Sequence, residues 1–270
     1  GAAMAGYALI AATIVDMMKE AGFGMDMWSP ISKRVIKLLS FQMVDDATIV
    51  HGGPTNFTSG EEIFATMQDL LNHWEGGLHT AGGTIATDKS YWHLIDFKWT
   101  GGKWKYRGLD EVPGDLTITG PNGTPVVIPR LDVTESKELL GLMIRPDGKE
   151  SDQVKHLRQK TKAWADKVRT GHIQPEDAWY CTTRTIMKTV EYPLMATTMT
   201  KKELTHVMAP LLLAGLPKSG VQACFPRVLV HASLRVQGLE LYHPFNTQLI
   251  EHLLAILRHG TRHTLTGDLL

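Results

Sequence analysis

Two kinds of hydrophobic pattern divide the chain. Up to about residue 149, short apolar runs alternate with Gly- and Pro-containing turns, which predicts strands mixed with a few helices. After residue 150 the apolar positions recur at helical spacing. We therefore expect an α+β fold in two parts, with antiparallel strands and helices in residues 1–149 and an all-helical region in residues 150–270.

Capping residues and periodicity predict the helices. Residues 2–21 are apolar on nearly every face, so this helix should be buried all round. Ser59 and Glu62 form a capping box, which should begin a helix that ends near His73, before two Gly-Gly pairs. Further helices are expected at residues 152–169, from Pro175, from Thr200 to about Ala214 and from about Asn246 to Arg258.

The expected strands lie beside turn residues. Residues 32–44 and 47–50 are β-like runs on either side of Asp45-Asp46, which suggests a hairpin with the acids at its turn. Because no Gly or Asn flanks the acids, the pattern alone does not predict it. A second hairpin is expected at residues 116–128, around a Pro-Asn-Gly turn. Residues 139–145 should form one short strand.

Residues 90–107 predict a hairpin of alternating aromatic and basic residues around Gly101-Gly102. The alternation favours two faces, with the aromatic side chains turned toward a core and the lysines toward solvent. The alternative is a surface on which the bases of single-stranded nucleic acid stack.

Charge is balanced overall but divided unequally. Lys+Arg and Asp+Glu are both 28. Residues 1–150 hold 13 basic and 19 acidic side chains, whereas residues 151–270 hold 15 and 9. The second part is therefore the one suited to an anionic polymer.

Cysteine is scarce, because Cys181 and Cys224 are the only two. This excludes a disulfide scaffold and favours an intracellular protein, nuclear or cytoplasmic. The longest apolar run, residues 2–15, is too short to cross a bilayer, so no membrane partner is expected. The twelve histidines lack cysteines or acids at ligand spacing, so no zinc site is expected.

Asp45-Asp46 is the main candidate for chemistry. Adjacent carboxylates between apolar runs repel each other, and a bound cation offsets that cost. Enzymes of phosphoryl transfer use such pairs to hold Mg²⁺ ions. A solvated turn is the other interpretation, since Asp is common in turns.

The segment from Phe41 to Val50, FQMVDDATIV, resembles the aromatic-x-Asp-Asp hairpin of reverse transcriptases, especially those of non-LTR retrotransposons. Other segments follow in that family's order. Gly1-Ala2-Ala3 with the long helix that follows resembles the tail of the palm segment after the Gln-Gly turn. Residues 82–90 resemble the palm segment that carries a Lys near the nucleotide phosphates. Residues 138–142 resemble the Leu-Gly hairpin of the primer grip, and the helical region from Asp152 resembles the thumb.

The resemblance implies a partial polymerase palm in residues 1–149 and a thumb in residues 150–270. It makes Asp45 and Asp46 ligands of two Mg²⁺ ions and places Lys89 at the phosphates of the incoming deoxynucleoside triphosphate. Primer contacts are implied for Met43, which replaces the family's usual Tyr or Phe, and for Leu140 and Gly141.

A further catalytic Asp of the family has no counterpart in this sequence, because only Asp16 and Asp26 precede Asp45 and both belong to or follow the first helix. We therefore expect the chain to be a C-terminal piece of a longer polymerase, inactive by itself, with an incomplete metal site.

From Lys155 onward, the predicted helix 152–169 carries six basic residues and one acid, Asp166. Four of them fall near one face, namely Lys155, Arg158, Lys162 and Arg169. An ordinary solvated face is one interpretation. A helix that follows the phosphates of a template–primer duplex without recognising its sequence is the other.

The expected function is RNA-templated addition of deoxynucleotides to a primer 3′ end. The expected partners are an RNA or DNA template with its primer, and deoxynucleoside triphosphates. Two alternatives stay open: a non-catalytic nucleic-acid-binding remnant of a retroelement, and a structural domain in which Asp45-Asp46 is a plain turn.

Overall fold

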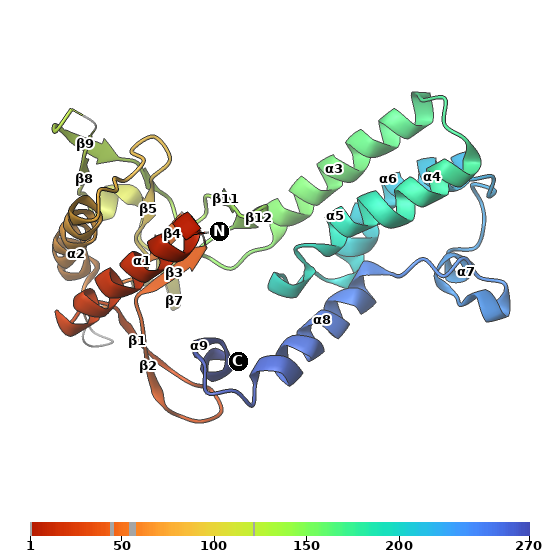
Figure 1. The fold of residues 1–270 in the computed structure, drawn as a ribbon. Coiled ribbons are helices and arrows are strands. Elements are labelled where there is room, and N and C mark those ends of the chain that lie inside the picture. The colour runs from red at the N-terminus through yellow and green to blue at the C-terminus, as the bar shows by residue number, and fades with distance from the viewer. Residues whose placement is uncertain (1, 44–45, 54–57, 121) are drawn as a thin grey trace. The chain divides into compact units, whose positions relative to one another are not determined.

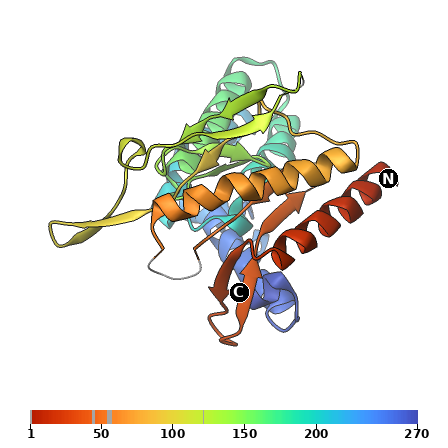
Figure 2. The same ribbon diagram turned by 90° about the vertical axis from the view of Figure 1, so that its left-hand side faces the viewer.

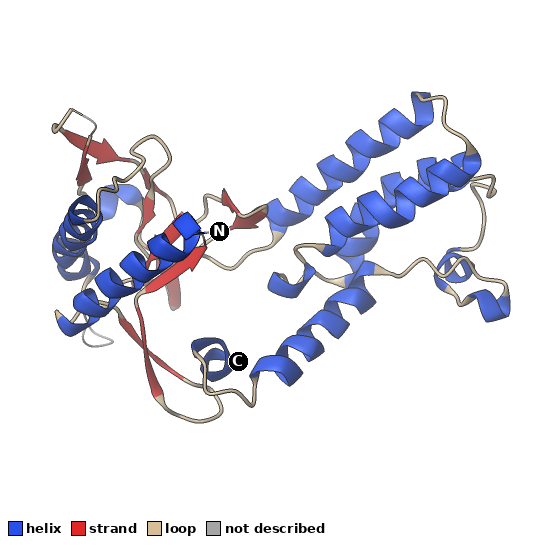
Figure 3. Cartoon of the chain, in the orientation of Figure 1, coloured by secondary structure: helices blue, strands red, loops and turns tan. Residues whose placement is uncertain are grey.

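The computed structural model describes residues 2–43, 46–53, 58–120 and 122–270. Helices and short strands alternate in it, and this α+β content confirms the predicted class (Figures 1 and 3). The chain divides into two compact units. Unit 1 comprises Gly1–Glu135 with His263–Leu270, and unit 2 comprises Ser136–Arg262.

The division between the units falls earlier than the boundary at 149/150 that the pattern predicts. Strands β11 (Lys137–Leu139) and β12 (Leu142–Ile144) form an antiparallel hairpin in place of the single strand expected at 139–145. This hairpin joins the helices, because the Met143 N–H donates to Gln153 Oε1 at 2.7 Å. Gln153 is buried, so the bond also satisfies a polar group inside unit 2.

Helices α1 (Ala2–Glu20) and α2 (Gly60–Thr80) pack together in unit 1. The expectation that α1 is buried all round is wrong. It buries Ala11, Ile14 and Met18 on one face and leaves Leu9 72% exposed on the other. An apolar sequence permits burial on every face, but a helix packed against one neighbour achieves it on only one.

Helix α2 begins at the predicted capping box but continues past His73 to Thr80. The Gly76-Gly77 pair, expected to end it, lies inside it. A Cβ on Gly77 would come within 2.7 Å of Ile14 Cγ1, so this glycine serves the close approach of α1 to α2. The packing contact outweighs the modest cost of glycine within a helix.

Every sheet in the described part of unit 1 has two strands. The expected run 32–44 is divided at Leu39: its first part pairs with an unpredicted strand and its second with the run after the acids. The pairs are β1 (Met25–Trp28) with β2 (Val35–Leu38), β3 (Ser40–Met43) with β4 (Asp46–Ile49), β6 (Phe97–Thr100) with β7 (Lys103–Tyr106), β8 (Leu116–Thr119) with β9 (Pro125–Ile128), and, in parallel, β5 (Trp92–His93) with β10 (Arg130–Leu131).

Side chains of α2 satisfy backbone groups of strand β8. The Gln68 amide donates to Thr117 O at 2.8 Å and accepts from Thr117 N at 2.9 Å. The buried Glu75 carboxylate accepts from the N–H of Thr119 at 2.6 Å. These bonds tie β8 to α2 where a further strand would otherwise pair.

Unit 2 is helical after the β11–β12 hairpin. Its longest helices, α3 and α6, pack along each other, and α6 begins at the predicted capping box of Thr200 and Glu203. It runs past the expected end at Ala214. The helices are α3 (Ser151–Thr170), α4 (Pro175–Cys181), α5 (Met187–Glu191), α6 (Lys201–Lys218), α7 (Arg227–His231) and α8 (Pro244–His259); α9 (Leu265–Leu269) belongs to unit 1.

Candidate nucleic-acid interface

The β3–β4 hairpin forms where the family resemblance implied it. Met43 pairs with Asp46 in its register, and Asp46 is the first residue of β4, with an exposed side chain. Asp45 and Val44 lie outside the described residues, as does the side chain of Met43. The described part of the Asp-Asp pair therefore stands at the end of an exposed hairpin.

The segment that carries Lys89 leads to Tyr91, whose hydroxyl lies within electrostatic range of Asp46. Lys89 is exposed and lies in a turn, where its backbone N–H donates to Ala86 O at 3.3 Å. Two residues further on, burial and then the negative charge of Asp46 raise the pKa of the Tyr91 hydroxyl. Asp46 therefore lies within the range of an electrostatic effect on Tyr91.

The described residues alone do not fit a two-magnesium site. No cluster of three or more His, Cys, Asp or Glu side chains suited to a metal occurs among them. Asp46 supplies one carboxylate, whereas two Mg²⁺ ions held for phosphoryl transfer need several oxygen ligands. Asp45 lies outside the described residues, so its part in a site stays a prediction.

The predicted primer-grip residues occupy the tip of the β11–β12 hairpin. Leu140 and Gly141 both have positive φ angles, 52° and 82°, as a tight two-residue hairpin turn requires. The Tyr192 hydroxyl donates to Leu140 O at 2.8 Å and fixes this turn. Gly141 is thus needed by the turn itself, and a Cβ there would lie 3.3 Å from Tyr192 Cε1.

Arg145 joins the hairpin to the start of α3. It contacts the buried carboxylate of Asp147 at 2.7 Å and that of Asp152 at 3.1 Å. Burial alone would raise the pKa of Asp147, but hydrogen bonds from Arg145 and from the Lys149 N–H outweigh burial and lower it. The ion pairs therefore hold the hairpin against the helix that carries the basic face.

Three of the four basic residues predicted to share a face of α3 are exposed: Lys155, Lys162 and Arg169. Arg169 is also paired with Asp166 at 3.4 Å. The fourth, Arg158, is half-buried and donates to the backbone carbonyl of His206 in α6. Its guanidinium therefore helps to join two helices, so the predicted basic face is reduced to the other three.

The aromatic side chains of β6–β7 contradict the expectation that they face a core. Phe97, Trp99, Trp104 and Tyr106 are all exposed, although they share one face as predicted. The exposure of these four rings instead favours the alternative interpretation, in which the hairpin presents an aromatic surface.

Sequence reasoning missed two tyrosines that connect the candidate segments. The charge of Asp46 contributes to the raised pKa of Tyr91, and Tyr192 bonds the turn at Leu140. Neither interaction leaves a local signal, because each joins segments that are distant in sequence.

No protein-family model and no curated protein sequence matches this chain. Within the described ranges, none of the helices combines the length and apolar character that a membrane span requires.

Proposed function

We propose that this chain is part of an RNA-directed DNA polymerase of the reverse-transcriptase type. Unit 1 would supply the rear of the palm and unit 2 the thumb, which holds the duplex of template and primer. The reaction adds a deoxynucleotide to a primer 3′ end. The observation that carries the proposal is the β3–β4 hairpin, which forms at the segment that resembles the family's Asp-Asp hairpin and presents Asp46 as the exposed first residue of β4.

The form of the β3–β4 hairpin supports this role. Among the described residues its two strands pair only with each other. An unpaired strand edge can accept a further strand. The family resemblance implies one that carries an additional catalytic Asp, and with Asp45 and Asp46 it would complete the set of carboxylates.

The exposed charges of α3 support the contact with duplex. Lys155 and Lys162 are two helical turns apart on one face, and α3 packs along α6. Phosphate contacts of this kind are independent of base sequence, as a polymerase requires.

Binding of an RNA–DNA duplex at a series of salt concentrations tests the contact. The double variant Lys155→Gln, Lys162→Gln should lower the magnitude of the salt slope by about 0.9 for each phosphate contact removed. The control is Lys160→Gln, Lys167→Gln, which removes the same charge about 140° away around the helix. Equal slopes for the two double variants would contradict a specific basic face.

Primer extension separates the polymerase from a non-catalytic binder. The chain alone should bind duplex without extending it. Expressed together with the segment that the resemblance places before Gly1, it should extend a primer on an RNA template, and Asp45→Ala should abolish extension while leaving duplex binding unchanged. Duplex binding without extension in both forms would favour the non-catalytic alternative.

A further inference from the structure

The β6–β7 hairpin presents four aromatic rings on one exposed face. Phe97 pairs with Tyr106 and Trp99 with Trp104, with ring centroids 4.8 and 5.1 Å apart. The two tryptophans are 60% and 67% exposed. Gly101 and Gly102, with φ angles of 61° and 75°, close the hairpin in a tight turn. In Figure 2 the hairpin, drawn in yellow, projects from unit 1 beyond the N-terminal end of α2.

These rings lie outside the cores of unit 1. Trp74 and Trp92 are buried in the two clusters there, whereas no ring of the hairpin belongs to either. Large exposed apolar groups gathered in one patch mark binding surfaces more often than scattered ones do. The patch therefore needs an explanation other than packing within unit 1.

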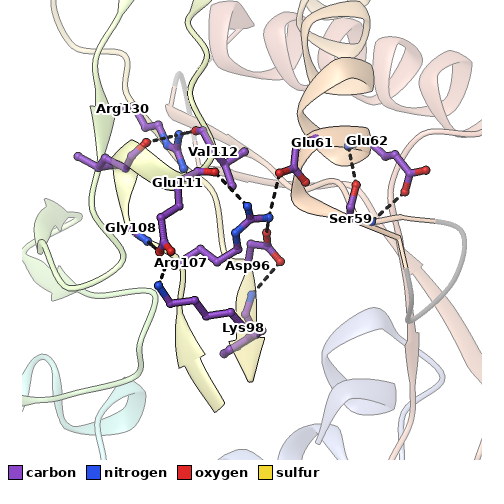
Figure 4. Close-up of polar contacts among 12 residues, drawn as sticks. Ser59, Glu61, Glu62, Asp96, Lys98, Arg107, Gly108, Glu111, Val112 and Arg130 are labelled. Atoms are coloured by element: carbon purple, nitrogen blue, oxygen red, sulfur yellow. Dashed lines mark hydrogen bonds and ion pairs between the residues drawn. The ribbon is translucent and has the colours of Figure 1, made fainter. Parts of the chain in front are cut away.

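Ion pairs fix the base of the hairpin to α2 (Figure 4). The Arg107 guanidinium contacts Asp96 at 3.0 Å and Glu61, in the first turn of α2, at 2.9 Å. Asp96 can approach α2 closely because Gly60 has no side chain; a Cβ there would lie 2.4 Å from Asp96 Oδ2. The aromatic face thus extends from an anchored base and is already assembled before any ligand arrives.

A second set of bonds holds strand β6 through Lys98 and Glu111. Lys98 forms an ion pair with Glu111, and the other oxygen of that carboxylate accepts from the Gly108 N–H at 2.8 Å (Figure 4). Lys98 also stands directly across the ladder from Lys105, a repulsive arrangement. Glu111 offsets the charge of Lys98 and leaves Lys103 and Lys105 exposed.

The charge of the hairpin is entirely positive, because residues 97–106 contain three lysines and no acid. The lysines lie on the face opposite the rings. Since paired strands are only about 5 Å apart, a lysine side chain is long enough to reach around such a ribbon. Rings on one face with flexible cations at the edges match a chain of bases joined by phosphates.

We propose that the β6–β7 hairpin binds single-stranded nucleic acid, with bases stacked on Trp99 and Trp104 and phosphates drawn to Lys103 and Lys105. This site is separate from the duplex contact of α3 and does not depend on the Asp-Asp hairpin. In a polymerase it would suit the unpaired part of a template, but the binding itself stands without catalysis.

Titration of a fluorescein-labelled polyuridine oligonucleotide with the whole chain tests the site. The variant Trp99→Ala, Trp104→Ala should weaken binding about 5- to 150-fold for each base that loses its stacking partner. Trp28→Ala, which removes another exposed tryptophan of unit 1, is the matched control and should leave the affinity unchanged. Trp99→Phe, Trp104→Phe should retain most of the affinity, because a ring remains.

Two further measurements complete the test. Lys103→Gln, Lys105→Gln should reduce the magnitude of the salt slope by about 0.7 per phosphate contact. Duplex binding should be the same in the Trp99→Ala, Trp104→Ala variant and the unmodified chain, so failure of this site is distinct from failure of the α3 contact. Unchanged polyuridine binding in that variant would overturn the proposal. The proposal would also be overturned if the Trp99→Ala, Trp104→Ala variant lost binding to anionic phosphatidylserine vesicles but kept binding to polyuridine. That result would assign the hairpin to a lipid surface.

Discussion

Unit 2 buries its apolar side chains in one core, whereas unit 1 divides them between two smaller ones. The core of unit 2 collects residues from α3, α5, α6 and the segments around α7. In unit 1, one cluster lies between α1 and α2 and the other between α2 and the β5 and β8–β9 strands. A helical bundle can close one core around itself, but two-stranded sheets need a helix to cover them.

This difference matters for binding. In unit 2 the exposed charges stand on a long helix held by a continuous core. In unit 1 the exposed rings of β6–β7 stand on a hairpin whose base is held to α2 by the ion pair of Arg107 with Glu61. We therefore expect large, spreading effects from core changes in unit 2 and local effects from anchor changes in unit 1.

The largest expected effect comes from Leu211→Ala, at a fully buried position in the core of unit 2. The lost contacts and the cavity should lower the free energy of unfolding by about 2–5 kcal/mol. Hydrogen exchange measured by mass spectrometry should show faster exchange throughout residues 136–262. An equal acceleration of exchange in unit 1 would mean that unit 1 and unit 2 unfold together.

Glu75→Ala should have a smaller and more local effect. It removes the acceptor of the Thr119 N–H, and an unsatisfied buried donor costs about 1–3 kcal/mol. Exchange should accelerate at β8 and β9 and stay unchanged in unit 2. Glu75→Gln, which keeps an acceptor oxygen, is the control and should lose less stability.

The two capping boxes offer the same change in each unit. Ser59→Ala removes the cap of α2, and Thr200→Ala removes the cap of α6. Each should cost about 1 kcal/mol. Denaturant titrations followed by hydrogen exchange should show that each variant lowers the free energy of unfolding of its own unit. A loss that appears in both units from either variant would contradict their independence.

The smallest expected effect is that of acidification on stability. Burial, followed by the charges of His231 and Lys201, lowers the pKa of His243. The unfolded chain then binds more protons than the folded one, so stability is present above the ordinary pKa of about 6.5 and falls as the pH drops below it. Protonation also opposes the bond that the Phe245 N–H donates to His243 Nδ1 at the start of α8.

His51 provides the matched group in unit 1, since burial lowers its pKa as well. Unfolding of the two units between pH 7.5 and pH 5 should be compared with that of His243→Asn and His51→Asn. Each variant should flatten the pH dependence of its own unit. If the pH dependence of unfolding is unchanged in either variant, the titration of that histidine does not contribute to stability.

Local sequence signals predicted much of the fold. Both capping boxes, the helix at 151–170 and three hairpins follow from residues near one another in the chain. The errors arose where a distant partner decides the outcome. Gly77 stays helical because of Ile14, and the 139–145 strand becomes a hairpin whose turn is held by Tyr192.

The candidate site was predictable in part for the same reason. The basic helix can be recognised from local pattern, and the Asp-Asp hairpin is expected from the family resemblance of residues 41–50. The partner of Arg158 and the exposure of Trp99 and Trp104 depend on what the rest of the chain leaves uncovered, which alternation of residue types does not specify. The electrostatic effect of Asp46 on Tyr91 likewise joins two separate segments.

The central claim is that the Asp46 neighbourhood receives a primer end, and photocrosslinking tests it most directly. An RNA template annealed to a DNA primer with a photoreactive 3′-terminal nucleotide would be irradiated with the chain, and the crosslinked peptides identified by mass spectrometry. The account predicts crosslinks within residues 40–49 or 86–91. Crosslinks confined to other parts of unit 1 or to unit 2 would contradict it.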